Sequence, residues 1–288
     1  MRFKRMTAIA AVAVVAFGTA SCAKKDEPAA PTSKFAAGTT MDRIAKAGKF
    51  NVGTKWDQPL FGLKGLAKAP EGFDVEIVKI IAAELGIKDD KVHYEETVSK
   101  VREDFISSGR VDMIVATYTI NDARKEKISF AGPYYEAGQD ILVAKDDTTI
   151  TGPEIFKTDA TKKVCSVTGS TPAKKIAEYA TAPGQVVLFD VYTKCLDALK
   201  NKQVAAVTTD NVILMGYVSK EPDKFKVLGK PFTKEPYGIG VKKDDKVFRD
   251  WINDIIEKAF ADGRYKAAWD KTVGAIAPMP KEIKVNRY

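Results

Sequence analysis

Histidine and cysteine, the side chains that most often hold transition metals, are scarce in this 288-residue sequence. It has one histidine, His93, and three cysteines, none of them in the paired spacing of a zinc site. A metal centre is therefore not expected, and a cysteine nucleophile would lack a general base. We expect no cofactor, and we assign His93 a structural place in a strand.

Long apolar runs are also missing, apart from one near the N-terminus that is too short to cross a bilayer at about 20 residues. Basic residues come first, an apolar run follows from 8 to 17, and small residues 18–21 lead to Cys22. This order predicts a secretory signal peptide over residues 1–22. The mature chain is therefore expected to be exported.

Cys22 directly follows the small residues, as in the lipobox of bacterial lipoproteins, whose cysteine thiol is acylated before cleavage. Thr19 differs from the leucine usual at its position, and ordinary cleavage that leaves Cys22 free is the alternative. Residues 23–40 are rich in Pro, Ala and Lys, which predicts a flexible tether. We predict that Cys22 carries lipid, palmitate included, and anchors the protein on the outer face of the cell membrane.

The charge pattern argues against a nucleic-acid partner. Removal of Arg2, Lys4 and Arg5 with the signal peptide lowers the formal charge from +8 to +5 (8 − 3), and the remaining lysines alternate with acidic residues. A mild positive bias suits a small anionic ligand, although most of these charges are expected to be solvated. About 248 residues follow the tether, enough for one large domain or two of average size.

The two remaining cysteines, Cys165 and Cys195, form an even pair in a chain that is expected to be exported. An oxidising compartment favours a disulfide between them. Closing a loop of roughly 30 residues would stabilise the fold by about 3–4 kcal/mol in the chain-entropy account.

Strand-like and helix-like segments alternate along most of the chain. Strands are predicted at 50–53, 92–94, 111–116, 141–144, 163–167, 186–189 and 205–208. Helices are predicted at 73–86, 101–108, 172–179, 195–201, 211–219, 247–263 and 265–272. This alternation is typical of α/β folds with parallel sheets, in which ligands bind beyond the carboxyl ends of the strands.

Four of these strands are followed by polar segments, after residues 52, 116, 167 and 208. One of them contains Arg124, whose planar guanidinium suits a carboxylate. Another contains Asp210, which suits an ammonium group. A third, the turn at Ser170 and Thr171, opens a helix, whose free N–H groups favour an anion. Together these groups suit a zwitterion such as a free amino acid.

Several long segments resemble the bacterial extracellular solute-binding proteins of family 3, which serve polar amino-acid ABC importers. The matching segments run from Val52 to about Lys271 and include GFDVEIVKIIAAELG (72–86), SGRVDMIVATYTINDARKEKISFAGPYY (108–135), VTGSTPAKK (167–175) and KEPYGIGVKKDD (234–245). Within this family, GTKWDQP (53–59), the GSTPA turn and the VC…KC cysteine pair are most similar to the glutamate-binding lipoproteins.

The resemblance implies roles for individual residues around the ligand's α-carboxylate. Thr117 and Thr119 match positions that hold this carboxylate, together with Arg124. Ser170 and Thr171 match the turn of the second lobe that completes the carboxylate cage.

It implies further roles for residues at the rest of the ligand. Asp210, with Thr209 beside it, matches the acidic residue that pairs with the α-ammonium. Lys55 and Arg102 match basic positions that meet the side-chain carboxylate in acidic-amino-acid binders, although either is also compatible with a solvated surface charge. Trp56 is expected near the mouth of the site, over the ligand.

One position separates this sequence from the glutamine- and histidine-binding relatives. It has Ser99 where a stacking aromatic residue would otherwise lie, which favours a charged ligand held by Arg102. We therefore expect a receptor for glutamate, then aspartate. The alternatives are a glutamine or asparagine receptor of the same family, a dehydratase-like enzyme on this fold, and a sensor input domain. No spare Glu or His with an orienting partner supports the enzyme.

By the same resemblance, the fold is a two-lobed α/β fold of the type II periplasmic-binding-protein class with two crossing hinge segments, near 141–145 and 237–242. The first lobe is expected to comprise residues 41–141 and 238–288, and the second lobe residues 142–237. We expect a monomer that closes on its ligand and delivers it to a membrane permease.

Overall fold

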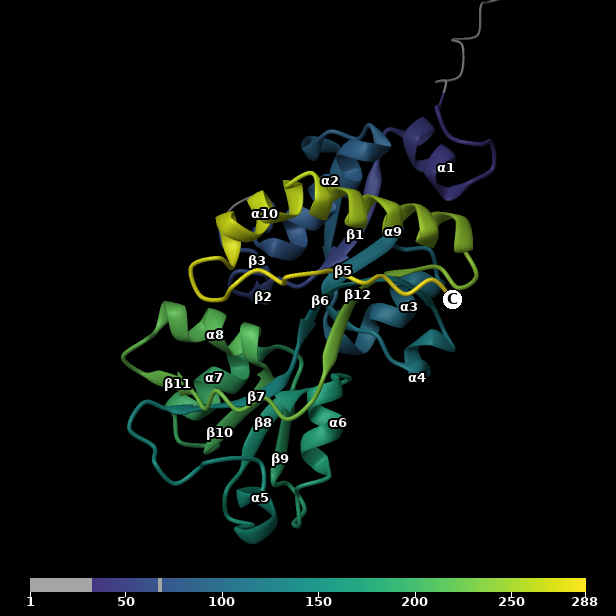
Figure 1. The fold of residues 1–288 in the computed structure, drawn as a ribbon. Helices are drawn as coiled ribbons and strands as arrows, with labels where there is room; N and C mark the ends of the chain where they lie inside the picture. Colours follow the sequence, from purple (N-terminus) through teal and green to yellow (C-terminus); the bar gives the residue numbers. More distant parts are fainter. Residues whose placement is uncertain (1–32, 67–68) are drawn as a thin grey trace, which may run out of the picture. The chain divides into compact units, whose positions relative to one another are not determined.

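The structure is a computed structural model that describes residues 33–66 and 69–288. The predicted signal peptide, the lipidation site Cys22 and most of the predicted tether lie outside the described residues. Two five-stranded sheets, each with helices on its faces, form the described part of the chain (Figure 1). The prediction of a two-lobed α/β fold is confirmed, because each sheet has buried apolar clusters of its own.

The first sheet has the strand order β4-β1-β5-β12-β6. Its strands are β1 (Phe50–Thr54), β4 (Val92–Glu96), β5 (Met113–Thr119), β6 (Ser129–Ala137) and β12 (Glu235–Val241). β1 runs parallel to β4 and β5, whereas β12 lies antiparallel between β5 and β6. All residues of β5 are buried, as expected of an inner strand covered on both faces.

The second sheet has the strand order β11-β7-β10-β8-β9. Its strands are β7 (Gln139–Ala144), β8 (Val164–Val167), β9 (Val186–Phe189), β10 (Ala206–Asp210) and β11 (Phe225–Val227). β8 is parallel to β9 and β10, and β7 is antiparallel to β10 and β11. A separate two-stranded ribbon, β2 (Asp57–Gln58) with β3 (Gly62–Leu63), follows β1 in the first lobe.

The chain crosses between the sheets twice, at Gly138 and over residues 228–234. The sequence prediction placed these crossings a few residues later, near 141–145 and 237–242, but those residues belong to β7 and β12. The prediction was wrong there because an extended crossing segment and a buried strand share the same apolar pattern.

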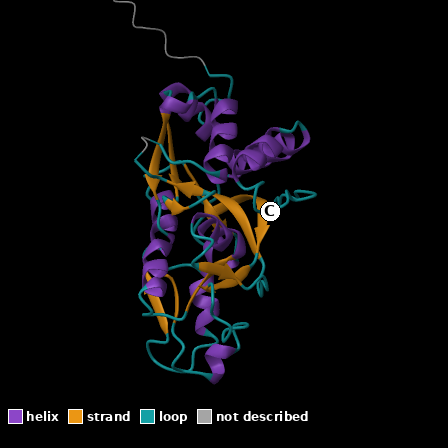
Figure 2. Cartoon of the chain, turned by 90° about the vertical axis from the view of Figure 1, so that its left-hand side faces the viewer, coloured by secondary structure: helices purple, strands orange, loops and turns teal. Residues whose placement is uncertain are grey.

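Helices cover both faces of each sheet (Figures 1 and 2). On the first sheet, α2 (Phe73–Leu85), α9 (Lys246–Ala261) and α10 (Arg264–Thr272) pack on one face, and α3 (Arg102–Ser107) packs on the other. On the second sheet, α7 (Tyr192–Lys200) and α8 (Asn211–Lys220) lie opposite α5 (Ile155–Thr158) and α6 (Thr171–Ala177). The short helices α1 (Thr40–Ala47) and α4 (Asp122–Lys125) and the 3₁₀ turns Asp89–Lys91 and Ser99–Val101 complete the described elements.

The start of α2 depends on a glycine. Gly72 precedes the helix with a φ of 127°, which side-chain-bearing residues rarely adopt, and a Cβ there would clash with the backbone carbonyl of Phe61. This close approach packs the first turn of α2 beneath the end of β5 and brings Asp74 to Thr117. The helix ends at Gly86 in the left-handed conformation, as its sequence predicts.

The predicted disulfide is present in the second lobe. Cys165 of β8 and Cys195 of α7 are joined by a bond of 2.03 Å, and both side chains are fully buried. Because the bond ties a helix to a central strand, it braces the layer that α7 forms on the second sheet.

Both ends of the described chain pack against the first lobe. Thr40 opens α1 and Phe35 contacts the ring of Trp251 edge to face at 5.5 Å, so the predicted tether to residue 40 is too long. The apolar Phe35 gives that polar stretch a packing anchor. At the other end, the backbone N–H of Asn286 donates to the carbonyl of Gly132 at 2.7 Å, which covers part of the edge strand β6.

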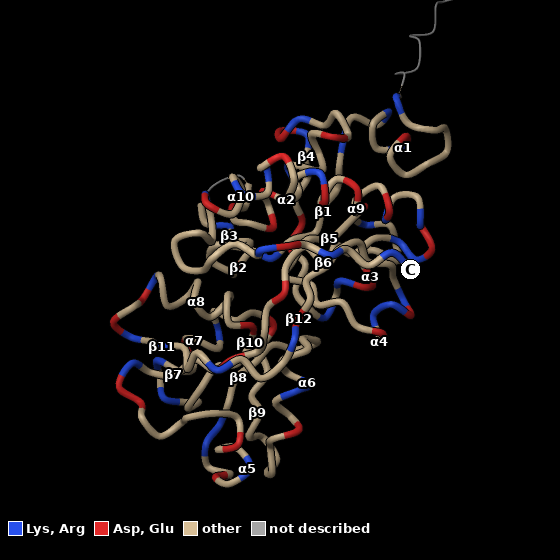
Figure 3. The backbone as a smooth tube through the Cα atoms, viewed as in Figure 1, with Lys and Arg blue, Asp and Glu red and all other residues tan. Residues whose placement is uncertain are grey.

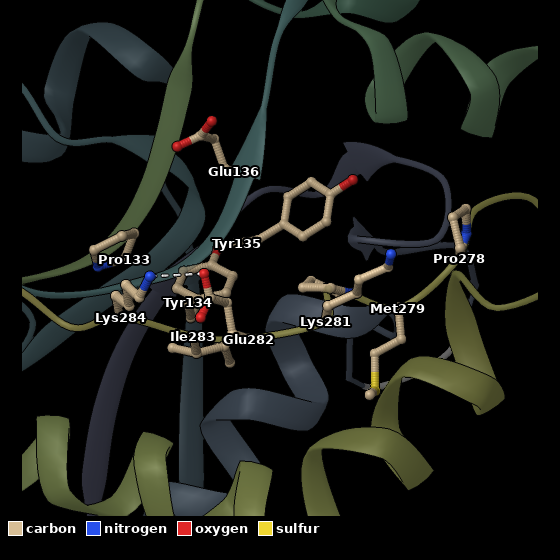
Figure 4. A pocket seen from close by; sticks show the side chains of 11 residues that line it. Pro133, Tyr134, Tyr135, Glu136, Pro278, Met279, Lys281, Glu282, Ile283 and Lys284 are labelled. Atoms are coloured by element: carbon tan, nitrogen blue, oxygen red, sulfur yellow. Dashed lines mark ion pairs between the residues drawn. The ribbon is translucent and has the colours of Figure 1, made fainter.

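A hollow remains between this C-terminal segment and β6 (Figure 4). Prolines, Met279 and the rings of Tyr134 and Tyr135 form much of its wall, and Glu282 pairs with Lys284 at its rim. In the view of Figure 3, Lys and Arg are interspersed with Asp and Glu along the backbone of both lobes. Within the described ranges, no helix has the length and apolar character of a membrane span.

Candidate functional site

A small cavity lies between the two lobes, where ends of strands and starts of helices from both sheets converge. Its wall is polar apart from one proline, one tyrosine and one isoleucine. The lining residues are Gln58, Ser99, Arg102, Thr117, Thr119, Ser170, Thr171, Pro172, Tyr192, Thr209, Asp210 and Ile213. Seven of the ten predicted ligand-binding residues are among them, and Ser99 also lines the cavity.

Several of these residues lie in strands instead of the loops that the sequence predicted. β5 continues through Thr117 to Thr119, and β10 continues through Thr209 to Asp210. Threonine favours strands, and Thr119, Thr209 and Asp210 stay paired within their sheets. Thr117 lies at a shift in the pairing register of β5 with β12. The site is therefore built on sheet backbone, which holds side chains more rigidly than a loop does.

The end of β5 has an unusual backbone conformation at Thr117. Its φ of 44° lies in the left-handed region that a β-branched residue rarely adopts. The Thr117 N–H donates to the buried carboxylate of Asp74 at 2.8 Å, and its hydroxyl donates to Gln58 Oε1 at 2.9 Å. Asp74 also accepts the hydroxyl of Tyr134 at 2.6 Å. These bonds hold the strained residue in place beside the cavity.

Arg102 lines the cavity from the start of α3 and is 3% exposed. Its Nη1 donates to the carbonyl of Ala116 at 2.9 Å, and its guanidinium lies 4.0 Å from the centre of the Tyr118 ring. Its Nε is buried and has no hydrogen-bond partner among the described residues. Within the same residues, no carboxylate lies within 4.0 Å of this guanidinium, so its charge is not neutralised by an ion pair.

Arg124 lies beside the cavity, in an adjoining hollow that shares Ser170 and Thr171 with it. Its Nη1 donates to the carbonyl of Thr119 at 2.7 Å, and its Nη2 reaches the carbonyl of Gly169 in the second lobe at 3.2 Å. Burial and the nearby Arg102 lower the pKa of Arg124 to about 10, so it stays cationic at neutral pH.

Glu103 lies 3.3 Å from Nε of Arg124, so every nitrogen of this guanidinium has a protein partner. The predicted contact of Arg124 with a ligand carboxylate therefore stays a prediction. It would require Nη1 or Nη2 to use its second N–H.

Asp210 reaches the cavity from the second lobe, at the end of β10. Its Oδ2 accepts the hydroxyl of Tyr237 at 2.6 Å, and its Oδ1 is buried without a partner among the described residues. Burial, with the Glu235 carboxylate as the next cause, raises the pKa of Asp210 to about 8. The hydroxyl of Thr209 beside it is also buried and unpartnered within the described chain. These two oxygens suit a ligand cation that donates hydrogen bonds.

Ser170 and Thr171 lie where predicted, at the start of α6, but their hydroxyls already have partners. The Ser170 hydroxyl caps the helix by accepting the N–H of Ala173 at 3.0 Å and donates to the carbonyl of Val167 at 2.9 Å. The Thr171 hydroxyl donates to Glu235 at 2.7 Å. The hydroxyls of both residues therefore stabilise the turn. The backbone of the turn is a separate candidate for contact with a ligand.

Lys55 and Trp56 do not line the cavity. The ammonium of Lys55 is buried 3.9 Å from Asp57 Oδ1 and 5.8 Å from the centre of the Tyr192 ring, which lines the cavity. Burial lowers the pKa of Lys55. The ring of Trp56 lies under the ammonium of Lys64 at 3.7 Å. Their predicted ligand contacts stay predictions that this geometry does not support directly.

Sequence reasoning missed Gln58, Tyr192 and Glu235. Gln58 lies in the GTKWDQP segment already quoted, so its polar side chain was an available signal. Tyr192 opens α7, three residues before the predicted helix start. The sequence around it has no feature that indicates a cavity. Glu235 begins β12 and is 4% exposed, and only the fold reveals that it lies beside Thr171.

Residues 50–275 match the sequence model of the bacterial extracellular solute-binding proteins, family 3. The chain belongs to this family. It is 40% identical over 245 residues to the glutamate-binding protein GluB of Corynebacterium efficiens, covering 82% of each chain. It is 38% identical over 242 residues to the ABC transporter glutamine-binding protein GlnH of Bacillus subtilis, covering 84% of this chain and 87% of the relative.

Solved structures agree with this assignment. An ancestral arginine-binding protein bound to glutamine superposes with a TM-score of 0.72 at 35% identity, covering 79% of this chain and 98% of that structure. The fold predicted from the sequence, a two-lobed solute-binding fold, is therefore confirmed by comparison as well as by the sheets themselves.

The raised pKa of Asp210 predicts a pH-dependent stability. Because the native carboxyl binds a proton up to about pH 8 and the unfolded one only to about its usual 3.8, its contribution to the free energy of unfolding is full below pH 4 and lost as the pH rises through 8. We expect Asp210→Asn to match the ligand-free wild type at pH 4 and to exceed it by about 1 kcal/mol or more at pH 9. Urea unfolding at both pH values measures this, and parallel curves would contradict it.

Proposed function

We propose that this solute-binding protein is the receptor of an amino-acid ABC importer and that it binds L-glutamate, with L-aspartate second and glutamine more weakly. Its relatives include a glutamate-binding and a glutamine-binding protein at nearly the same identity, so their names do not choose between acid and amide. Our choice of the acid over the amide rests on the charges at the cavity.

The observation that carries the acidic assignment is that the Arg102 guanidinium has no carboxylate in ion-pair contact among the described residues, although the charge of Arg102 still lowers the pKa of the more distant Glu103. The other basic side chains buried at the cleft each have a carboxylate nearby, Asp57 for Lys55 and Glu103 for Arg124. Arg102 has none within 4.0 Å among the described residues, although it is buried and lines the cavity. Because an unpaired buried charge costs several kcal/mol, a ligand that brings a carboxylate gains more than its amide does.

The remaining groups suit the two ends common to all amino acids. Asp210, from the second lobe, would accept the α-ammonium at its unpartnered Oδ1. The α-carboxylate would lie between Thr117, Thr119 and the turn at Ser170, with Arg124 behind them. Lys55 would not contact the ligand, but its positive charge would add to that of Arg102 and attract the side-chain carboxylate.

This arrangement links binding to closure. Arg102 belongs to the first lobe and Asp210 to the second, and in the described part of the chain the backbone passes between the lobes at Gly138 and over residues 228–234. A ligand that contacts both charges stabilises the closed form relative to the open one. We propose that a membrane permease recognises this closed form of a monomeric receptor.

An enzymatic role has one feature in its favour that the sequence did not reveal. Glu235 is a buried carboxylate whose two oxygens accept the hydroxyls of Thr171 and Thr233 at 2.7 and 2.9 Å. Glu235 does not line the cavity, however; Thr171, which does, is bonded to it. We therefore propose binding without turnover.

Calorimetric titration of the purified mature protein tests the ligand. We expect tight binding of L-glutamate, weaker binding of L-aspartate and weaker binding still of L-glutamine, because only the acids neutralise Arg102. Tight glutamine binding without a glutamate response would sink the acidic assignment. Conversion of the titrant, followed by chromatography of the same samples, would instead support an enzyme.

Replacing Arg102 tests which group reads the ligand's side chain. We expect Arg102→Ala to weaken glutamate binding about 10- to 100-fold more than glutamine binding, in line with about 1.5–3 kcal/mol for a charged hydrogen bond. The ratio of the two affinities is the readout, because general damage lowers both equally. Arg110→Ala is the matched control, since Arg110 also stacks on an aromatic ring but is exposed and does not line the cavity. Equal losses for both ligands would show that Arg102 does not read the side chain.

We also propose that Cys22 carries the lipid that holds the receptor on the outer face of the cell membrane. The support is the order of basic, apolar and small residues before it. Cys22→Ser should release the protein into the medium with unchanged glutamate affinity, since the described body binds without the anchor. Fractionation of cells with a palmitate label measures this, and membrane retention of the unlabelled variant would contradict it.

A further inference from the structure

A turn of the first lobe contacts the second lobe beside the cavity. The carboxylate of Asp57, in β2, accepts the backbone N–H of Tyr192 at 2.8 Å. The hydroxyl of Tyr217 donates to the backbone carbonyl of the same Asp57 at 2.6 Å. All three residues are buried, at 7%, 2% and 4% exposure, so water does not compete well for these bonds.

The first of these bonds completes a helix that lacks its own cap. Val191 occupies the N-cap position of α7 and offers no side-chain acceptor, and no acidic residue lies in the first turn. The N-terminal N–H groups of a helix need such acceptors, and the helix dipole favours a negative charge there. Asp57 supplies both from the other lobe. Opening the lobes therefore leaves the start of α7 without this acceptor.

The second lobe also has a glycine at the point where this turn approaches it most closely. A Cβ on Gly216, in the middle of α8, would lie 2.6 Å from the carbonyl oxygen of Pro59. Gly216 has no positive φ, so its backbone conformation does not require glycine. The close approach of the first lobe is what requires it, because any side chain there would push against backbone.

We propose that residues 57–59 are a latch that holds the lobes closed against α7 and α8, so that Asp57 and Gly216 set the affinity for the ligand without touching it. This rests on the proposed closure, but not on the identity of the ligand. Asp57, Pro59 and Gly216 do not line the cavity, whereas Gln58, between the first two, does. The apparent affinity of a receptor falls in proportion to the fraction of molecules in the binding-competent state, so a weaker latch weakens binding of every ligand alike.

Gly216→Ala tests the latch by adding one methyl group at the contact. Alanine is a better helix former than glycine, so the helix itself is not weakened and a loss of affinity is not explained by unfolding. Gly152→Ala is the matched control in the same lobe, because a Cβ there meets nothing closer than 3.9 Å. Both are made in the mature protein carrying Cys22→Ser, which lets solution scattering report the radius of gyration without lipid.

Without ligand, we expect Gly216→Ala to show a larger radius of gyration than the wild type and Gly152→Ala to match the wild type. With L-glutamate, we expect an affinity about tenfold lower for Gly216→Ala, and an equal loss with L-glutamine. Equal ligand-free radii for Gly216→Ala and the wild type would overturn the latch, whatever the affinities. A shifted radius with no glutamate binding by the wild type would support the latch and overturn the glutamate assignment instead.

Tyr217→Phe is a second variant, which keeps the latch testable if Gly216→Ala does not fold. It removes only the hydroxyl that donates to Asp57, so we expect a smaller shift in radius in the same direction. Tyr179→Phe is its control, since that ring lies in the same lobe against Phe232 and away from the first lobe. Identical radii for Tyr217→Phe and its control would contradict the proposal.

Discussion

Charge buried between two lobes has to be balanced, and this requirement organises the whole cleft. Lys55 and Arg124 each have a carboxylate of the first lobe beside them, whereas Arg102 has none within 4.0 Å in the described chain. On the opposite side, Asp210 keeps an oxygen free and has its pKa raised to about 8. A ligand with complementary charges resolves both imbalances at once, which is why selectivity and closure depend on the same groups.

The rest of the site keeps these charges in position. Thr117 is held in a strained backbone conformation by Asp74, and Gly72 gives α2 the close approach that places Asp74 there. The second lobe contributes through turns whose hydroxyls are already bonded, such as Ser170. Most polar groups at the cavity are therefore held by hydrogen bonds within the protein, and a few have no such partner. This limits how far the site can rearrange for a different ligand.

The sequence was sufficient for the parts that depend on local pattern or on long matching segments. The boundaries of α2 and β9, the disulfide and most of the lining residues follow from it, because periodicity and motif order survive without coordinates. It was not sufficient where one residue meets another far along the chain. The contact of Glu235 with Thr171 and that of Asp57 with Tyr192 each join segments more than 60 residues apart, and no local pattern encodes them. The distance of 5.8 Å between the Lys55 ammonium and the Tyr192 ring also joins two segments far apart in the sequence.

The position of β12 has a consequence for how the chain is completed. This strand separates β5 from β6 in the first sheet, yet it is synthesised after the entire second sheet. A chain that emerges N-terminus first can assemble residues 139–227 as one continuous piece, disulfide included. The first sheet, in contrast, lacks the strand between β5 and β6 until β12, which ends at Val241, has emerged. The second sheet can therefore be complete before the first, although the first lobe begins earlier in the chain.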